Sequence, residues 1–454
     1  GRRPDRHRRG IRQGRLRLVR ELRSVRRPEV RGRRDGRAGR PRRRRGRPGR
    51  THDLRRALRP RHRALDGRQR DGLIVGWRGY LRHLDYLLLA VTLGVVAVGI
   101  AVVYFATHQD VEGQPGYYAV QQGVYAAVGL LVLLVLAAID YEHYRRWQWA
   151  LYGAMVLSIS AVYLVGSVTR GSRRWIELPF FNFQPSQFGL LLLTVCLGAF
   201  LVDRMELLGS RRITAEALLY AAVPGALVFF QPDFGTASVY AVLTLALLYF
   251  YGTRWTHFAV LGAAAAGAAA FVLGVLPRLG IELIKEYQME RLLVFVDPGR
   301  DPSGTGYNIV QSTIAIGSGA LTGRGAEATQ TAFDFLPEHH TDFIFAVIGE
   351  RYGFVGACVL LGLYGLLLWR ALRIATLSRD MYGSIMAGGI AAMFLFQMFV
   401  NIGMTIGIMP VTGIPLPFVS YGGAAMITFL MMVGLLQSIH VRATADPRER
   451  RARP

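Results

Sequence analysis

The sequence predicts an all-α membrane protein that crosses the bilayer about ten times. The chain has 454 residues, is 52% hydrophobic and has a positive mean hydropathy. Its apolar residues recur in runs of about 20, the length that spans the hydrocarbon core of a bilayer. Loops that carry Arg alternate with other loops between these runs, as expected of a polytopic protein.

The formal charge of +25 lies almost entirely at one end of the chain. Residues 1–70 hold 30 Arg and 6 acidic residues, whereas the remainder holds 25 basic and 24 acidic residues. We interpret residues 1–78 as an Arg-rich extension that is disordered, with three explanations open: nucleic-acid binding, an anchor to anionic lipid, or a wrongly assigned start. No aromatic platform accompanies these arginines, so we expect no nucleic-acid partner.

We expect ten membrane spans, with boundaries accurate to a few residues. They are 85–107, 117–139, 147–167, 186–203, 214–231, 236–252, 257–277, 343–372, 383–409 and 419–440. The basic loops 144–147, 209–214 and 370–380 belong to the cytoplasm by the positive-inside rule. Both termini, including the basic tail 441–454, then lie on the cytoplasmic side as well.

A long outer segment, residues 278–342, joins the seventh and eighth spans. We expect amphipathic helices around 281–295 and 306–317 within it. A shorter outer loop, 169–185, contains Arg170, Arg173 and Arg174 against the charge rule. Either the loop is short enough to tolerate them or they neutralise an external anion, which suits the guanidinium group and is the interpretation we favour.

Ionisable residues gather directly before the eighth span, in the stretch "FLPEHHTDFIFAVIGE" (335–350). Asp342 at the start of a helix is explained by the helix dipole alone, but Glu338, His339 and His340 are not. A weaker interpretation makes His340 and Asp342 ligands of a divalent cation, although the spacing is not that of a specific metal site.

These residues resemble the SEDS family (shape, elongation, division and sporulation). The resemblance extends to "RRWIELPFFNFQPSQ" (173–187), "QPDFGTA" (231–237), "VDPGRDPSGTGYNIVQSTIAIGSG" (296–319) and "NIGMTIGIMPVTGIPLPFVSYGG" (401–423). It covers about 80 to 440, in order, and so implies a ten-helix membrane domain over 79–440. The last motif is more similar to the elongation members, such as RodA, than to the division members.

The resemblance implies a peptidoglycan glycosyltransferase on the outer face of the bacterial cytoplasmic membrane. Such a protein polymerises lipid II, a disaccharide-pentapeptide on undecaprenyl pyrophosphate, with inversion at the anomeric carbon. Asp342 matches the essential aspartate of the family, and a carboxylate there can take the proton of the attacking sugar hydroxyl. A class B penicillin-binding protein is the implied partner, because the chain has no Ser-x-x-Lys transpeptidase motif.

The resemblance and the residue chemistry together give a set of expected substrate contacts. The leaving pyrophosphate needs positive charge from arginines or from a divalent cation, Mg²⁺ or Mn²⁺, which we keep open as a cofactor. Glu338 and His340 are also expected to position Asp342 or to tune the pKa of its carboxyl. The expected substrate-binding residues are Arg174, Gln184, Ser186, Asp233, Arg291, Gln311, Glu338, His340, Ser420 and Tyr421. Helix capping is the alternative for Asp233 and Ser186, and packing is the alternative for Gln311.

Two departures from the family pattern keep rival functions open. Where the family usually carries Glu and Lys near the start of the fourth span, this chain has Gln187 and Leu190. Losing both is consistent with loss of an ion pair, because loss of one partner would strand a charge. The usual "SYGGSS" is "SYGGAA" here, without the two hydroxyls at Ala424 and Ala425. The alternatives are therefore a flippase for a lipid-linked precursor or a non-catalytic scaffold for a penicillin-binding protein.

Overall fold

The structure, a computed structural model, describes residues 82–445 apart from several short gaps. The gaps are 109–113, 170–171, 178–181, 276, 280–292, 296, 302–303 and 329–334. All described residues belong to one compact unit, residues 67–454. The Arg-rich extension, the end of the basic tail and most of the helix expected around 281–295 lie outside the described residues.

Nine helices in the described part of the chain are long and apolar enough to cross a membrane, which confirms an all-α polytopic architecture. They are α3 (Tyr86–Thr107), α4 (Tyr117–Ala138), α6 (Gln148–Val165), α7 (Pro185–Val202), α8 (Arg211–Phe230), α9 (Phe234–Tyr251), α13 (Ile344–Leu377), α14 (Met381–Thr405) and α15 (Gly423–Thr444). Shorter elements are α5 (Glu142–Arg146), α12 (Thr305–Ser318) and the helical turns Met205–Leu207, Pro277–Leu279, Pro298–Arg300 and Gly325–Glu327. The expected helix at 306–317 is thus confirmed as α12.

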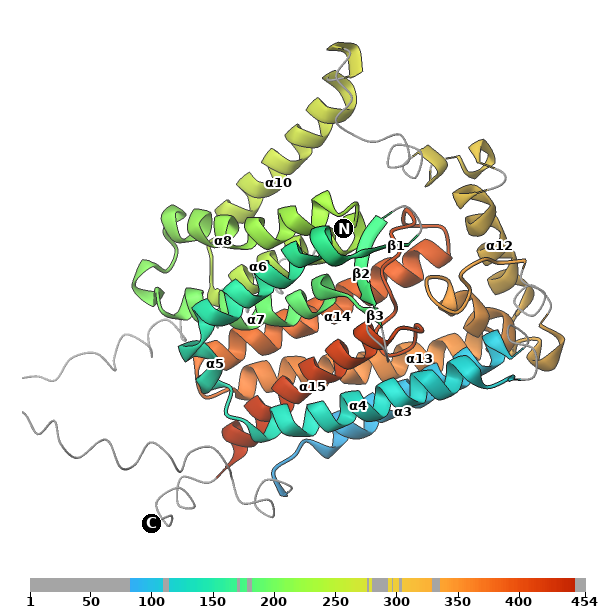
Figure 1. The fold of residues 1–454 in the computed structure, drawn as a ribbon, viewed down its shortest axis with the longest axis horizontal. Helices are drawn as coiled ribbons and strands as arrows, with labels where there is room; N and C mark the ends of the chain where they lie inside the picture. The colour runs from blue at the N-terminus through green and yellow to red at the C-terminus, as the bar shows by residue number, and fades with distance from the viewer. Residues whose placement is uncertain are drawn as a thin grey trace, which may run out of the picture. The chain divides into compact units, whose positions relative to one another are not determined.

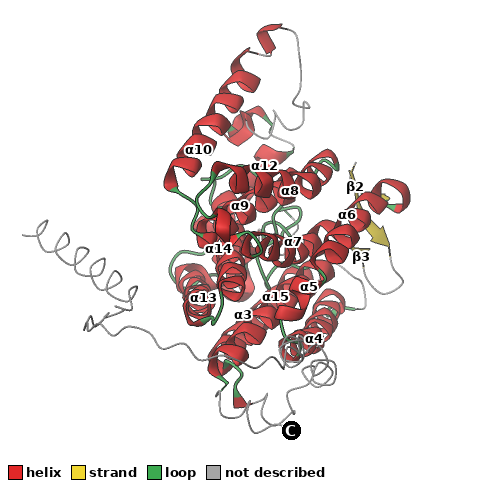
Figure 2. Cartoon of the chain, turned by 90° about the vertical axis from the view of Figure 1, so that its left-hand side faces the viewer, coloured by secondary structure: helices red, strands yellow, loops and turns green. Residues whose placement is uncertain are grey.

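The seventh expected span, 257–277, is shorter than predicted. It appears as α10 (Trp255–Ala270), which has 16 residues and no buried side chain, followed by a π-helical turn, Phe271–Val275. The 16 α-helical residues rise about 24 Å, less than the roughly 30 Å of a hydrocarbon core, and the π-helical turn extends the continuous run to Val275. Pro277 accounts for the end of the helical run, because proline cannot continue it. Figures 1 and 2 show α10 leading away from the other helices.

The most buried spans are α7, α14 and α15, which lie near the middle of the bundle in Figure 2. Helix α15 packs along α4, α14 packs between α9 and α13, and α13 also contacts α3. Small residues permit this close approach in a bilayer, where no hydrophobic force pulls helices together. A Cβ atom at Gly434 of α15 would lie only 2.8 Å from the Leu133 carbonyl oxygen of α4.

The loop 169–185, which we expect on the outer side, contains a small antiparallel sheet that the sequence interpretation missed. Strand β2 (Ser172–Glu177) pairs with β1 (Ser167–Thr169) on one side and with β3 (Asn182–Phe183) on the other. Within the described residues, the pairing on both sides of β2 satisfies main-chain polar groups of these three strands. The sheet ends just before α7, and the Arg174 side chain of β2 lies 3.6 Å from Asp233 at the start of α9.

Helix α13 is broken after its first turns, at Gly353, where φ is 61° and ψ is −160°. The break directs the N–H groups of Phe354 and Val355 to the carbonyl oxygens of Ala320 and Leu321, at 2.9 and 3.0 Å. These acceptors follow α12, so α12 is attached to the break itself. A side chain does not fit there, because a Cβ atom at Gly353 would lie 2.4 Å from the Gly323 nitrogen.

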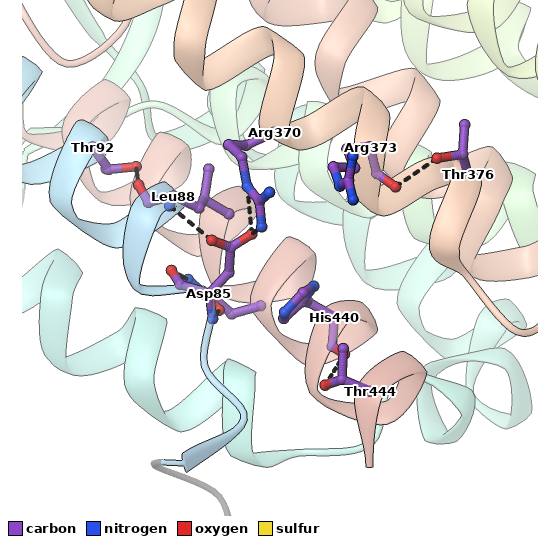
Figure 3. Close-up of polar contacts among 9 residues, drawn as sticks. Asp85, Leu88, Thr92, Arg370, Arg373, Thr376, His440 and Thr444 are labelled. Carbon is purple, nitrogen blue, oxygen red and sulfur yellow. Dashed lines mark hydrogen bonds and ion pairs between the residues drawn. The ribbon is translucent and has the colours of Figure 1, made fainter. Parts of the chain in front are cut away.

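A polar cluster ties three helices together at the end of the bundle where α3 begins (Figure 3). The Asp85 carboxylate caps α3 by accepting from the Leu88 N–H at 3.0 Å, and it is ion-paired with Arg370 of α13. Gln437 of α15 accepts from the Asp85 N–H and donates to the Asp85 carbonyl oxygen, both at 2.9 Å. Asp85 is 3% exposed, so this pair is screened little by water.

Asp85→Asn is expected to destabilise the bundle while keeping an oxygen that can cap α3. It leaves the Arg370 guanidinium, whose side chain is 14% exposed, without its counter-ion, and breaking a buried pair costs about 3–5 kcal/mol. Thermal unfolding in detergent would show a clear drop in the melting temperature.

The double variant Asp85→Asn with Arg370→Met provides the control, because removal of both charges strands neither. We expect it to recover most of the lost melting temperature. A double variant less stable than the single one would contradict the ion-pair explanation.

Candidate functional site

The turn before α13 is closed around Glu338. The N–H groups of Thr341 and Phe343 both donate to the Glu338 carbonyl oxygen, each at 3.2 Å. The Thr341 hydroxyl donates to the Glu338 carboxylate at 2.9 Å, and Glu338 has a positive φ of 59°. Such a conformation persists in a bulky residue only where surrounding contacts hold it. The turn therefore holds Asp342 in a defined place at the start of α13.

Asp342 lies at the boundary between accessible and buried chain. It is partly exposed, whereas every residue from Phe343 to Glu350 is buried. Phe343 is the N-cap residue of α13, so Asp342 lies one residue before it, near the positive end of the helix dipole. The helix dipole favours negative charge in this place, and the side chain is partly accessible from outside the bundle.

Ser420 and Tyr421 hold this turn from the loop that precedes α15. The Ser420 hydroxyl donates to the Thr341 carbonyl oxygen at 2.6 Å and accepts from the Leu416 N–H at 2.8 Å. The Tyr421 N–H donates to the His340 carbonyl oxygen at 3.0 Å, and its phenol donates to Gln121 of α4. Burial, reinforced by neighbouring tyrosines, raises the pKa of Tyr421 above its ordinary value, so the phenol remains a donor.

The two histidines have different surroundings. His339 is buried, and its ring nitrogens lie 2.9 Å from the Leu336 carbonyl oxygen and 2.8 Å from that of Ala106 in α3. His340 is partly exposed; its ring stacks on Tyr118 of α4 with centroids 5.5 Å apart and meets the edge of Tyr421. His339 thus links the turn to α3, and His340 belongs to an aromatic cluster beside Asp342.

A second carboxylate, Asp233, forms its own polar cluster at the start of α9. It caps the helix by accepting from the Thr236 N–H at 3.1 Å, which confirms the capping interpretation. Gln184 donates to its other oxygen at 3.3 Å, and the Arg174 guanidinium lies 3.6 Å away. Asp233 is 4% exposed, so Arg174 supplies the charge that its burial requires. Three of the predicted site residues therefore lie together.

The loop between α14 and α15 runs between the two carboxylates. A Cβ atom at Gly235, two residues after Asp233, would lie 2.5 Å from the Thr412 carbonyl oxygen. The next residue of the loop, Gly413, contacts Asp342, since a Cβ atom there would lie 3.4 Å from its Oδ2. Asp233 and Asp342 thus border the same short stretch of chain, although 109 residues separate them in sequence.

The first turn of α7 carries uncharged side chains where the resemblance implies a glutamate and a lysine, at Gln187 and Leu190. Ser186 does not cap the helix, since α7 begins at Pro185 and makes no side-chain cap bond. Its hydroxyl and the Gln187 carbonyl oxygen Oε1 are buried without a hydrogen-bond partner among the described residues. Leu190 is fully buried, so a lysine there would need the acidic partner that this chain has also lost.

Two further predicted residues lie apart from this set. Gln311 is half-buried on α12, which Ser312 attaches to α14 through a 2.8 Å hydrogen bond to the Thr405 carbonyl oxygen. Arg291 lies outside the described residues.

Sequence reasoning missed Gln122, a fully buried residue of α4 that donates to the Ser420 carbonyl oxygen and accepts from the Gly422 N–H. The sequence signal that could have revealed this residue is the polar pair of Gln121 and Gln122 within an otherwise apolar span.

The described residues do not build a metal site of their own. In the part of the chain that the structure describes, no three His, Cys, Asp or Glu side chains gather closely enough to hold an ion. A divalent cation near Asp342 would therefore need ligands from a bound phosphate group.

Comparison with known proteins places this architecture in one family. The model of the FtsW/RodA/SpoVE family, described as "Cell cycle protein", matches residues 82–445. The peptidoglycan glycosyltransferase MrdB of Escherichia coli is 39% identical over 362 residues, covering 79% of this chain and 94% of that protein. The stage V sporulation protein E of Bacillus subtilis is 34% identical and covers 78% and 96% of the two chains.

Solved structures agree with the sequence matches. One chain from a peptidoglycan synthase complex that coordinates polymerisation and crosslinking superposes with a TM-score of 0.67 at 30% identity, covering 80% of this chain and 99% of that one. The rod shape determining protein RodA of Thermus thermophilus superposes with a TM-score of 0.58 at 27% identity, covering 80% and 98%. The chain therefore belongs to the SEDS family of cell cycle proteins that FtsW, RodA and SpoVE define.

Proposed function

We propose that this protein is a peptidoglycan glycosyltransferase that polymerises lipid II on the outer face of the bacterial cytoplasmic membrane. One observation carries the proposal: a partly exposed carboxylate, Asp342, is held by a closed turn where the motifs shared with the family meet. The names of its relatives, at 31–39% identity over most of the chain, support the same activity. The similarity to the rod shape determining protein RodA, together with the motif at 401–423, favours a role in elongation and cell shape.

Asp342 is suited to act as the general base. A sugar hydroxyl of one lipid II molecule attacks the anomeric carbon of the other, a new C–O bond forms, and the bond to the pyrophosphate breaks with inversion. The proton leaves the attacking hydroxyl for the Asp342 carboxylate. The fixed turn means that the base reorganises little as charge develops.

Arg174 is suited to meet the pyrophosphate that leaves. Its side chain is 31% exposed and lies 3.6 Å from the Asp233 carboxylate, and the charge and planar shape of a guanidinium suit phosphate oxygens. Arg291 has the same proposed role. Gln184 supports Asp233, and His340 with Tyr118 and Tyr421 offers an aromatic surface for a sugar ring.

The orientation in the membrane follows from charge. By the positive-inside rule, the basic loops at 144–147, 209–214 and 370–380 favour a cytoplasmic start of α3 and end of α15, and an outer position for Asp342. A class B penicillin-binding protein is the proposed partner, since the chain lacks a transpeptidase motif and a solved relative belongs to a synthase complex.

A precursor flippase and a non-catalytic scaffold remain the rival functions. The cluster at Asp342 lies at the end of its helix, whereas transport sites lie near the bilayer midplane. Lipid II polymerisation by the purified protein with its partner distinguishes them, because only a polymerase yields glycan strands in detergent, where no sidedness exists.

Asp342→Asn is expected to lower the polymerisation rate about 10²–10⁴-fold, the usual contribution of a general base. Asparagine keeps the size of the side chain, so the melting temperature and the lipid II affinity should stay near those of the wild type. Strand length on gels measures the rate, and a variant that retains the wild-type rate would remove Asp342 from this role.

Arg174→Gln is expected to weaken the enzyme in two ways, through lost phosphate contact and through an unpaired Asp233. The paired variant Arg174→Gln with Asp233→Asn separates them, since it restores stability without restoring positive charge. We expect the pair to recover the melting temperature and not the rate. Recovery of both would make Arg174 a structural residue only.

The cation is tested by chelation. Because the described residues lack a three-ligand cluster, we expect any Mg²⁺ or Mn²⁺ to bind with the pyrophosphate of the substrate. EDTA should then abolish polymerisation without lowering the melting temperature of the substrate-free protein. A lower melting temperature after chelation would indicate a resident metal site.

A further inference from the structure

We infer that Asn401 of α14 is a positioning residue that sets the orientation of the Asp342 carboxylate. The inference rests on the proposed function in one respect only, that Asp342 is the reacting carboxylate. The physical link between the two residues stands on hydrogen bonds and can be tested without activity.

The Asn401 side chain joins the two parts of the site. It is fully buried at the outer end of α14. Its amide nitrogen Nδ2 donates to the main-chain carbonyl oxygen of Asp342 at 2.9 Å and to that of Ile414 at 2.8 Å. Both partners are acceptors, so only the NH₂ group of an amide satisfies them together, and the orientation of this amide is fixed.

The hydrogen bond from Asn401 to the Asp342 carbonyl oxygen is the last of three that hold successive carbonyl groups of the turn. Three successive carbonyl oxygens, those of His340, Thr341 and Asp342, accept from the Tyr421 N–H, the Ser420 hydroxyl and the Asn401 amide respectively. The first two donors come from the loop before α15 and the third from α14. The last carbonyl fixes the peptide plane that follows Asp342, and this plane helps to determine where the carboxylate points.

A second buried amide on the same face of α14, that of Gln397, makes no hydrogen bond to Asp342 and can be compared with Asn401. Gln397 lies one helical turn earlier and is 1% exposed, yet neither its Nε2 nor its Oε1 has a hydrogen-bond partner in the described structure. Asn401 differs because its two hydrogens serve the turn and the loop at once. Gln397 is therefore a matched control: the same helix, the same chemistry and the same burial, without the contact to Asp342.

The test compares Asn401→Leu and Asn401→Asp with Gln397→Leu in the full-length protein bound to its partner. Both Asn401 variants lose the donors, and the aspartate keeps the shape. We expect the turnover number to fall about 10- to 100-fold, as for a misplaced reacting group, with the KM for lipid II within about threefold of the wild type. Gln397→Leu should retain the wild-type turnover.

Hydrogen exchange of the 336–344 amides provides the readout that does not need activity. The donors from Asn401 close this segment, so its exchange should accelerate in both Asn401 variants and stay unchanged in Gln397→Leu. Unchanged exchange in either folded Asn401 variant, or an equal acceleration in the control, overturns the inference. So does a turnover loss that Gln397→Leu matches.

The failure of the two proposals can be told apart. If Asp342→Asn polymerises normally, the role of Asp342 is wrong, while faster exchange in the Asn401 variants still establishes the link. If Asp342→Asn is inactive and the Asn401 variants keep full turnover, only the positioning role is lost.

Discussion

The structure depends on one constraint: main-chain carbonyl oxygens that are buried inside the bundle must find hydrogen-bond donors within the protein. The turn from Leu336 to Phe343 is not helical, yet it enters the bundle at the start of α13. Its polar groups are satisfied by a side-chain amide, a hydroxyl, an N–H group and the turn itself. Each donor is specific in length and direction, so satisfying the backbone also fixes the place of Asp342.

The same constraint explains why distant segments of the chain meet. The donors to the turn come from α14 and from the loop before α15, and Gln122 of α4 pairs with that loop. At the other end of the bundle, the Asp85 cluster binds α3, α13 and α15. Helices α3 and α13 are therefore attached at both ends, which gives a rigid base for a site made largely of loop residues.

Much of the fold could be read from the sequence because hydropathy reports burial in lipid directly. Nine spans follow from apolar runs, whereas the α-helical part of the seventh, α10, is shorter than expected because the run continues as a π-helical turn after Ala270. Asp342 could be identified because Glu338, His339 and His340 gather beside it and because it matches the aspartate of the family motif. Asn401 could not, since its acceptors are main-chain oxygens 59 and 13 residues away that carry no sequence signal. The contact between His339 and Ala106, across 233 residues, is hidden for the same reason.

The most direct measurement is the structure of the protein with an unreactive lipid II analogue bound. The account predicts that a sugar hydroxyl lies within about 3 Å of the Asp342 carboxylate, the reach of a general base, with phosphate oxygens facing Arg174. An analogue bound near the bilayer midplane, with Asp342 out of reach of every sugar hydroxyl, would contradict it and would favour transport.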